Sequence, residues 1–323
     1  MTSEASETTE AIETAGREFV VEPAAAGRRL DVWLAERLGI GRAGVRKLLE
    51  AGVVRLDGRP LERRDKAAPI EAGRRVEVTG FAPPDARRAI AEPEQPLSVL
   101  ASGAGWLALD KPAGTPVHPL RTDETGTLLN ALIARHPEVH GVGEGGLRSG
   151  VAHRLDVHTS GVVLFGSDEA TWQRLRDAFR SHRVEKVYRA LVRGSLEGEG
   201  EVRVALAVAR HRPAFVRIVP ASQPGSRRTS LAWRALAHGA DVTLVEVRPR
   251  TGFLHQIRAT LAHLGHPLCG DLTYGAGLEA EDTSGAPRHL LHAARVRTGE
   301  IEAESPDAAD FAAACARLLA GRS

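Results

Sequence analysis

The chain has 323 residues, with 43 Lys and Arg against 41 Asp and Glu and a formal net charge of +2. This length allows one substantial core and a small additional module. The longest uncharged run, Gln95 to Leu109, has 15 residues interrupted by serine and glycine, which is short of the roughly 18 needed for a membrane span. Cys269 and Cys315 lie far apart and are expected as small buried hydrophobes in a reducing compartment. We therefore expect a cytoplasmic protein with no membrane partner.

Residues 1 to 26 are expected to form a disordered acidic tail. The first 16 residues contain four Glu, no Lys or Arg, and few apolar side chains. A signal peptide would need a basic start and an apolar stretch, and both are missing. Without these four acids, 43 basic residues face 37 acidic ones, and nearly all the cations are Arg. Arginine suits phosphate binding, although a GC-rich genome would also explain the Arg to Lys ratio.

Residues 27 to 80 are predicted to form a separate small domain. Two apolar stripes at helical spacing predict two helices separated by a Gly39 to Gly41 break: Leu30, Leu34, Leu38, then Val45, Leu48, Leu49. Asp57-Gly58 between two short apolar runs predicts a hairpin. The second helix would project Arg42, Arg46 and Lys47, either toward RNA phosphates or simply into solvent.

Residues 81 to 96 contain four prolines and no periodicity, which predicts a semi-rigid linker. The remaining residues, 97 to 323, are predicted to form a larger domain. Strands are expected near 97–101, 106–110, 162–166, 184–193, 201–209, 231–237, 241–248 and 290–297. Helices are expected near 127–135, 168–181, 254–264 and 307–320. This order predicts an α+β fold with a large mixed, mainly antiparallel sheet.

The segment Val151 to Gly166 contains the most informative pattern. It places one carboxylate, Asp156, between Arg154 and a hydroxyl and glycine turn, Thr159-Ser160-Gly161, with apolar runs on both sides. This pattern predicts an acid at a strand end that faces a cleft. An isolated Asp at such a place is more often a turn former that binds its own backbone.

Three further segments of the chain contain candidate site residues. Leu107 to Pro119 carries Lys111 before two proline-stiffened steps. Val184 to Gly194 is a strand-like run with Tyr188, which could equally be a half-buried aromatic of the sheet. Arg250 to Gly275 carries His255 and Arg258 at the start of a helical pattern.

The string His153-Arg154-Leu155-Asp156-x-x-Thr159-Ser160-Gly161 resembles the signature of the RluA-type RNA pseudouridine synthases. The resemblance implies that Asp156 is catalytic, that Arg154 helps to hold a flipped-out nucleotide, and that Tyr188 and Arg258 complete the active site. His153, Thr159, Lys111 and His255 are the further substrate-binding candidates. The resemblance also implies a curved central sheet with the cleft across its middle. Residues 27 to 80 look like an S4 RNA-binding module, and S4 followed by such a synthase is a common family order.

The implied reaction breaks the N1 to C1′ bond of uridine, turns the uracil over and joins C5 to C1′. A carboxylate such as Asp156 can attack or stabilise the electron-poor anomeric carbon. The Arg258 guanidinium would keep this acid ionised. The Tyr188 phenol can stack on the uracil and take part in the final proton transfer. Nothing is oxidised or hydrolysed, so no cofactor is expected.

Two features of the sequence bear on the lining of the site and on whether it could hold a metal. Where the family pattern usually has a polar, often basic pair, this chain has Phe253 and Leu254, which could line the pocket or tuck into the sheet. The 13 histidines invite a zinc site, but no HExxH or CxxC frame is present. Structural hydrogen bonds are therefore the better interpretation of His255 and His292, and no metal is expected.

The sequence thus favours an RNA pseudouridine synthase that acts on structured RNA. Large-subunit ribosomal RNA is favoured over tRNA by the S4-like segment, through family association alone. A tRNA-modifying enzyme is the nearest alternative, and a non-catalytic RNA-binding assembly factor on the same fold is the second. A nucleoside hydrolase would need a second carboxylate near the motif, which the sequence does not show. No obligate protein partner is implied, and nothing demands more than a monomer.

Overall fold

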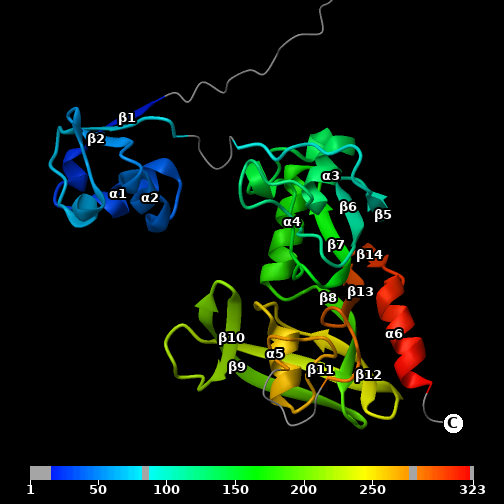
Figure 1. Ribbon diagram of the computed structural model, residues 1–323. Helices are drawn as coiled ribbons and strands as arrows, with labels where there is room; N and C mark the ends of the chain where they lie inside the picture. The colour runs from blue at the N-terminus through cyan, green and yellow to red at the C-terminus, as the bar shows by residue number, and fades with distance from the viewer. Residues whose placement is uncertain (1–15, 82–86, 276–281, 321–323) are drawn as a thin grey trace, which may run out of the picture. The chain divides into compact units, whose positions relative to one another are not determined.

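The computed structural model describes residues 16–81, 87–275 and 282–320, which form two compact units that divide between Arg88 and Ala89 (Figure 1). The division falls inside the predicted linker. Residues 1 to 15, most of the predicted acidic tail, lie outside the described residues. Among the residues that are described, no helix is both long and apolar enough to cross a membrane.

The first unit is a four-stranded antiparallel sheet with two helices. Its strands follow the spatial order β1-β4-β2-β3. They are β1 (Arg17–Val20), β2 (Val54–Leu56), β3 (Arg59–Pro60) and β4 (Arg75–Val78), and the helices are α1 (Leu30–Leu38) and α2 (Arg42–Glu50). The two apolar stripes meet in one core that also contains Trp33. Both predicted helices and the hairpin at Asp57-Gly58 are therefore present.

The ends of this unit differ from the predicted boundaries. Strand β1 lies inside the range expected to be a disordered tail, because Phe19 pairs with Val76 of β4 and Val21 is buried in the core. Phe81, expected in the linker, is buried in the same core. At the other end of the predicted linker, Ala89 packs into the core of the second unit. Strand β1, Phe81 and Ala89 therefore belong to the folded units rather than to the predicted tail or linker.

The second unit is built on a ten-stranded sheet in the order β10-β9-β11-β12-β8-β13-β7-β6-β5, with β14 paired to β13. The strands are β5 (Ser98–Gly103), β6 (Trp106–Lys111), β7 (Ser160–Gly166), β8 (Glu185–Arg193), β9 (Glu199–His211), β10 (Ala214–Val219), β11 (Arg227–His238), β12 (Val242–Pro249), β13 (Leu291–Thr298) and β14 (Ile301–Glu304). Only β7 and β13 pair in parallel among the strands described. The mainly antiparallel mixed sheet is confirmed, and β10 and β14 are additions.

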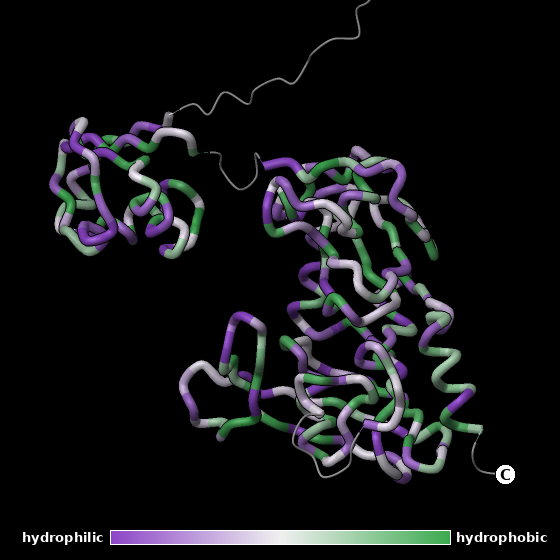
Figure 2. Tube along the Cα trace, in the orientation of Figure 1, coloured by the Kyte–Doolittle hydropathy of each residue, from purple (hydrophilic) through white to green (hydrophobic). Residues whose placement is uncertain are grey.

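Four helices accompany this sheet, all close to their predicted ranges. They are α3 (Leu128–Arg135), α4 (Glu169–Arg180), α5 (Gln256–His263) and α6 (Ala309–Leu319). Helix α4 begins where Asp168 accepts a hydrogen bond from the Thr171 amide, an N-cap that satisfies one free backbone donor. Hydrophilic and hydrophobic residues alternate along the chain of this unit (Figure 2). Cys269 and Cys315 are buried free thiols in one hydrophobic cluster, as expected.

Every residue of strand β7 is buried. The segment with Asp156 directly precedes this strand, so it leads into the middle of the sheet. Gly161 is required there, because a Cβ at this position would lie 2.2 Å from the Ala293 carbonyl oxygen of β13. Its φ of 110° also lies in the region that only glycine adopts freely. The glycine of the Thr159-Ser160-Gly161 turn thus lets β13 approach β7 closely beneath Asp156.

Candidate active site

The four predicted segments do not contribute equally to a pocket of the second unit, a cavity of about 640 Å³. Its lining includes Arg154, Asp156, Tyr188, His255 and Arg258, which come from the turn before β7, from β8 and from α5 with its preceding loop. The structure therefore brings these five predicted residues together. The volume lies within the usual range for small-molecule sites, roughly 300 to 1,000 Å³.

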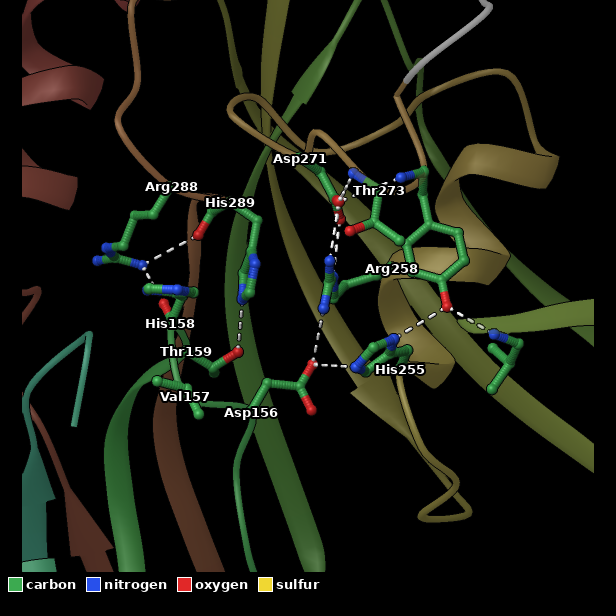
Figure 3. A network of polar contacts seen from close by, with 12 residues as sticks. Asp156, Val157, His158, Thr159, His255, Arg258, Asp271, Thr273, Arg288 and His289 are labelled. Carbon is green, nitrogen blue, oxygen red and sulfur yellow. Dashed lines mark hydrogen bonds and ion pairs between the residues drawn. The ribbon is translucent and has the colours of Figure 1, made fainter. Parts of the chain in front are cut away.

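Asp156 is the carboxylate at the centre of this group. Arg258 donates from Nη1 to Asp156 Oδ2 over 3.3 Å, and His255 Nε2 lies 3.8 Å from the same oxygen (Figure 3). The Asp156 side chain keeps 24% of its surface exposed, whereas that of Arg258 keeps 8%. One carboxylate oxygen is thus held by cationic and polar groups while the residue still faces the pocket.

Arg258 is fixed by a second acid, Asp271, which the sequence patterns did not identify. Arg258 donates from Nε and Nη2 to the two Asp271 oxygens over 2.8 and 2.9 Å. Burial alone would raise the pKa of Asp271, but these bonds hold it below its ordinary value. One signal was available: a buried arginine needs a carboxylate, and Asp271 is the first acid after Arg258 in the chain.

Lys111 lies beneath the turn rather than in the pocket. Its side chain is fully buried, and Nζ donates to the carbonyl oxygens of Pro112, Thr115 and Val157 over 2.8 to 2.9 Å. Burial lowers the pKa of Lys111 to about 7, while three acceptors match the three hydrogens of an ammonium group. The predicted substrate contact is therefore replaced by a supporting role, because Val157 directly follows Asp156.

Two other buried contacts hold the same turn from below. Arg288 donates to the His158 carbonyl oxygen over 2.9 Å and also binds Asp310. The Thr159 hydroxyl lies 2.9 Å from His289 Nε2, and Thr159 itself is only 2% exposed. Thr159, predicted to bind substrate, thus has its hydroxyl occupied by a buried partner. Neither Arg288 nor His289 was identified from the sequence as a support of this turn.

His153 also has a structural place. Its Nε2 accepts a hydrogen bond from the Leu164 amide over 2.9 Å, and its ring stacks on Phe179 at 4.4 Å. Burial lowers the pKa of His153 to about 3, so the ring is neutral. His153 also lines the pocket, so its substrate contact stays a prediction, although its Nε2 is already used. His292 is a structural residue as predicted, bonded to Ser160 and close to the Ser305 carbonyl.

Tyr188 and Arg154 both line the pocket that contains Asp156. Arg154 is exposed, and Tyr188 is half-buried on β8. Burial, with the nearby Asp156 carboxylate, raises the pKa of the Tyr188 phenol above its ordinary value. The phenol therefore remains protonated at neutral pH. Phe253 and Leu254 line the pocket and also pack against a hydrophobic cluster formed with β9 and β10. Both of the places expected for this pair are therefore observed.

The described residues contain no group of three or more His, Cys, Asp or Glu side chains arranged to hold a metal ion. His289 is used by Thr159, and His292 by Ser160. His289 and His292 therefore serve hydrogen bonding.

Comparisons with known proteins identify the same region. Residues 105–263 match the family described as RNA pseudouridylate synthase. The chain is 36% identical over 286 residues to a protein of Chloroflexus aurantiacus named as an uncharacterized RNA pseudouridine synthase, covering 88% of this chain and 86% of the relative. It is 32% identical over 297 residues to the ribosomal large subunit pseudouridine synthase D of Xanthomonas campestris, covering 89% and 86%.

A solved structure, human RNA pseudouridylate synthase domain containing 1, matches with a TM-score of 0.55 and 27% identity. The match covers 69% of this chain and 90% of that one. A pocket centred on a carboxylate, held by arginine and faced by tyrosine, thus lies within a fold and a sequence region that both agree with one family. The chain belongs to the RluA-type RNA pseudouridine synthases, and it is an RNA pseudouridine synthase.

Proposed function

We propose that this enzyme isomerises specific uridines of large-subunit ribosomal RNA, with Asp156 as the catalytic carboxylate. The observation that carries the proposal is the geometry of Asp156, whose Oδ2 is held by Arg258 while the side chain faces an open pocket. Relatives named as ribosomal large subunit pseudouridine synthase D support ribosomal RNA as the substrate. A tRNA substrate remains the alternative.

The groups in the pocket suit each step of the isomerisation. The N1 to C1′ bond breaks with its electron pair on the uracil, and Asp156 attacks or stabilises the electron-poor C1′. After C5 joins C1′, C5 must lose its proton and N1 must gain one. Tyr188 enters as a neutral phenol, so it can give a proton to N1 and then receive one from C5. Substrate and product have the same atoms, and no group is oxidised.

The uridine must leave its stack to reach Asp156, at a cost of a few kcal/mol. Arg154 is exposed at the pocket mouth, next but one to Asp156 in the chain. Its guanidinium can fill the place of the extruded base or bind a flanking phosphate. We assign it to holding the flipped nucleotide. The half-buried ring of Tyr188 supplies a stacking surface for the uracil.

A basic arm near the pocket suits the flanking RNA backbone. The segment 202 to 240 contains no Asp or Glu and forms β10 with most of β9 and β11. Its exposed arginines include Arg210, Arg212, Arg217, Arg227 and Arg228. Among the described residues no carboxylate pairs with any of these five. Because β10 packs against the cluster that includes Phe253 and Leu254, RNA on the arm would continue toward the pocket.

The first unit is proposed to be an S4-type RNA-binding module. Arg46 and Lys47 extend from α2, and Lys47 is exposed. Arg42 is also exposed, but its guanidinium binds the buried Asp31 over 3.0 Å. The pair orients Arg42 without covering it, and this anchoring was not anticipated from the sequence. The three cations would contact phosphates with little base recognition.

The test is a pseudouridine map of total RNA from cells with and without the gene, repeated with the Asp156→Asn protein restored. We expect particular large-subunit rRNA uridines to lose modification in the deletion, and only the wild-type protein to restore them. Loss at tRNA sites instead would move the substrate to tRNA.

The substitution keeps the size of the side chain, and the RNA affinity of Asp156→Asn should stay within a few fold of wild type. If the Asp156→Asn protein restores the sites, Asp156 is not the catalytic group. If no site changes in the deletion, an RNA-binding role without catalysis on cellular RNA becomes the better account.

A further inference from the structure

Tyr274 and His255 form a chain of contacts that ends at Asp156. The Val216 amide of β10 donates to Tyr274 Oη over 3.0 Å, and Tyr274 Oη lies 3.0 Å from His255 Nδ1. The other ring nitrogen, His255 Nε2, lies 3.8 Å from Asp156 Oδ2 (Figure 3). These groups come from β10, from the loop after α5 and from the residue before α5, so the tertiary fold alone assembles the chain.

We propose that Tyr274 fixes His255 in its Nε2–H tautomer, and that His255 acts as a positioning residue that presents Asp156 to the ribose through Oδ1.

Hydrogen-bond accounting favours this tautomer. A phenol has one hydrogen to donate and can accept in return. The Val216 amide can only donate, so it uses the acceptor side of Tyr274 Oη. The phenol hydrogen is then free for His255 Nδ1, which must be unprotonated to accept it. The ring proton therefore lies on Nε2, where it points to the carboxylate.

The other arrangements are each worse on physical grounds. With the proton on Nδ1, the phenol hydrogen would lose this acceptor, and the Nε2 lone pair would face the Asp156 carboxylate. A doubly protonated ring would also deprive the Tyr274 hydrogen of its acceptor. Burial lowers the pKa of His255, although the Asp156 charge opposes this shift. Burial raises the pKa of Tyr274, so its hydrogen is retained.

The charged groups around His255 act in both directions. Asp156 and Asp271 favour a protonated ring, whereas Arg258 and Arg154 oppose it. The backbone of His255 has φ 50°, in the left-handed region that non-glycine residues rarely adopt. This conformation places the residue ahead of the first turn of α5. The local strain is consistent with a side chain that must reach Asp156 from a fixed point.

The consequence is a difference between the two oxygens of Asp156. Arg258 and His255 both approach Oδ2. No hydrogen bond from a described residue reaches Asp156 Oδ1, whereas Arg258 bonds to Oδ2. A carboxylate held at one oxygen cannot rotate freely, so the other oxygen is presented in a defined direction. His255 thus supplies orientation and does not itself react.

The tautomer can be measured without any substrate. Protein labelled with ¹⁵N at its histidine nitrogens would be studied by long-range ¹H–¹⁵N correlation, with the His255 signals assigned by their loss in His255→Asn. We expect the Nε2–H form alone at neutral pH in the wild type. In Tyr274→Phe, which keeps the ring beneath Arg258, the Nδ1–H form or the charged ring should appear.

Phe215→Leu is the matched control, since it removes the ring stacked on Tyr274 at 5.2 Å and leaves the hydroxyl in place. It should leave the His255 tautomer unchanged. An Nδ1–H ring in the wild type, or an unchanged His255 signal in Tyr274→Phe, would overturn the inference.

A kinetic test rests on the proposed catalytic role of Asp156. In His255→Gln the amide nitrogen can reach the position of Nε2–H, whereas the shorter Asn cannot. We expect His255→Asn to lower the single-turnover rate by about tenfold with RNA affinity nearly unchanged, and His255→Gln to recover most of the rate. RNA from cells lacking the gene serves as substrate.

The backbone preference alone would favour Asn over Gln in the left-handed region. A faster Asn variant would therefore contradict the positioning role of His255. If no variant and no wild-type protein turns over this RNA, the substrate assignment fails while the tautomer measurement still decides the inference.

Discussion

Asp156 and Tyr188 lie in different electrostatic surroundings. Asp156 lies beside a guanidinium that is itself neutralised by Asp271. Tyr188 lies where burial and the Asp156 charge both disfavour a phenolate. A carboxylate held by a guanidinium, beside a phenol that is protonated at neutral pH, is the pairing used in the proposed isomerisation.

Replacement of Tyr188 by Phe should separate stacking from proton transfer. The ring remains, so RNA affinity should change by less than a few fold, while single-turnover product formation should slow by about a hundredfold. The wild-type rate should also not rise steeply as the pH approaches about 10, where an ordinary tyrosine ionises, because the raised pKa keeps this phenol protonated. A normal rate in Tyr188→Phe would remove the hydroxyl from the chemistry.

Sequence motifs identify the residues that line the pocket more readily than the residues that hold those side chains in place. Asp156, Tyr188 and Arg258 lie in recognisable motifs. Lys111 and Thr159 lie in or next to such motifs too, but their motif position does not reveal whether a side chain points into the pocket or under it. Supporting partners such as Asp271, Tyr274, Arg288 and His289 are defined by tertiary contacts, which no local pattern contains.

The turn from Asp156 to Gly161 is the element on which the site depends. Its Val157 carbonyl accepts from Lys111 and from the Gly114 amide, and its His158 carbonyl accepts from Arg288. A buried polar group without a partner is costly, at roughly 1 to 3 kcal/mol. Lys111 and Arg288 therefore both help to support the turn.

Lys111→Met removes the three hydrogen bonds of a buried ammonium group at once. We expect the free energy of unfolding to fall by about 2 to 4 kcal/mol, seen as a lower urea midpoint. The single-turnover rate should fall as well, because the Val157 carbonyl next to Asp156 then keeps only the Gly114 amide as a donor. Lys47→Met on the exposed face of α2 is the control and should change the free energy by less than about 0.5 kcal/mol. Equal midpoints for the two variants would mean that water replaces the ammonium group.

The elements themselves were largely predictable from hydrophobic periodicity, as the matches for α4, β8 and β12 show. In the large sheet, two strands were not predicted, for different reasons. Strand β10 follows a short turn in a run rich in arginine, where charge obscures the alternation. Strand β14 has four residues and pairs only with β13, so its stability comes from that partner.

We propose two basic surfaces for RNA binding, one on each unit. To compare them, we would measure the salt dependence of RNA binding for Arg212→Gln/Arg217→Gln on the arm and for Arg46→Gln/Lys47→Gln on α2. The slope of log affinity against log salt should become shallower by about 0.7 to 0.9 for each phosphate that the variant no longer binds.

Arg121→Gln/Arg297→Gln is the charge-matched control, because both arginines already bind carboxylates. Its slope should change less than that of either test variant. An unchanged slope for the arm variant would remove the arm from the RNA path, and an unchanged slope for the α2 variant would count against an S4-type role. The sequence predicted the cations of α2 but not the arm, because spacing does not show that β9 and β10 form one projecting hairpin.

The order of strands in the large sheet affects how the enzyme folds during its synthesis. Strand β13 lies between β7 and β8, although both precede it in the chain by about a hundred residues or more. During synthesis, β7 and β8 therefore each keep an open edge until residues 291 to 298 have left the ribosome. Such edges invite pairing with other chains. The two halves of the candidate site, with Asp156 before β7 and Arg258 on α5, thus join in the sheet only after this strand is available.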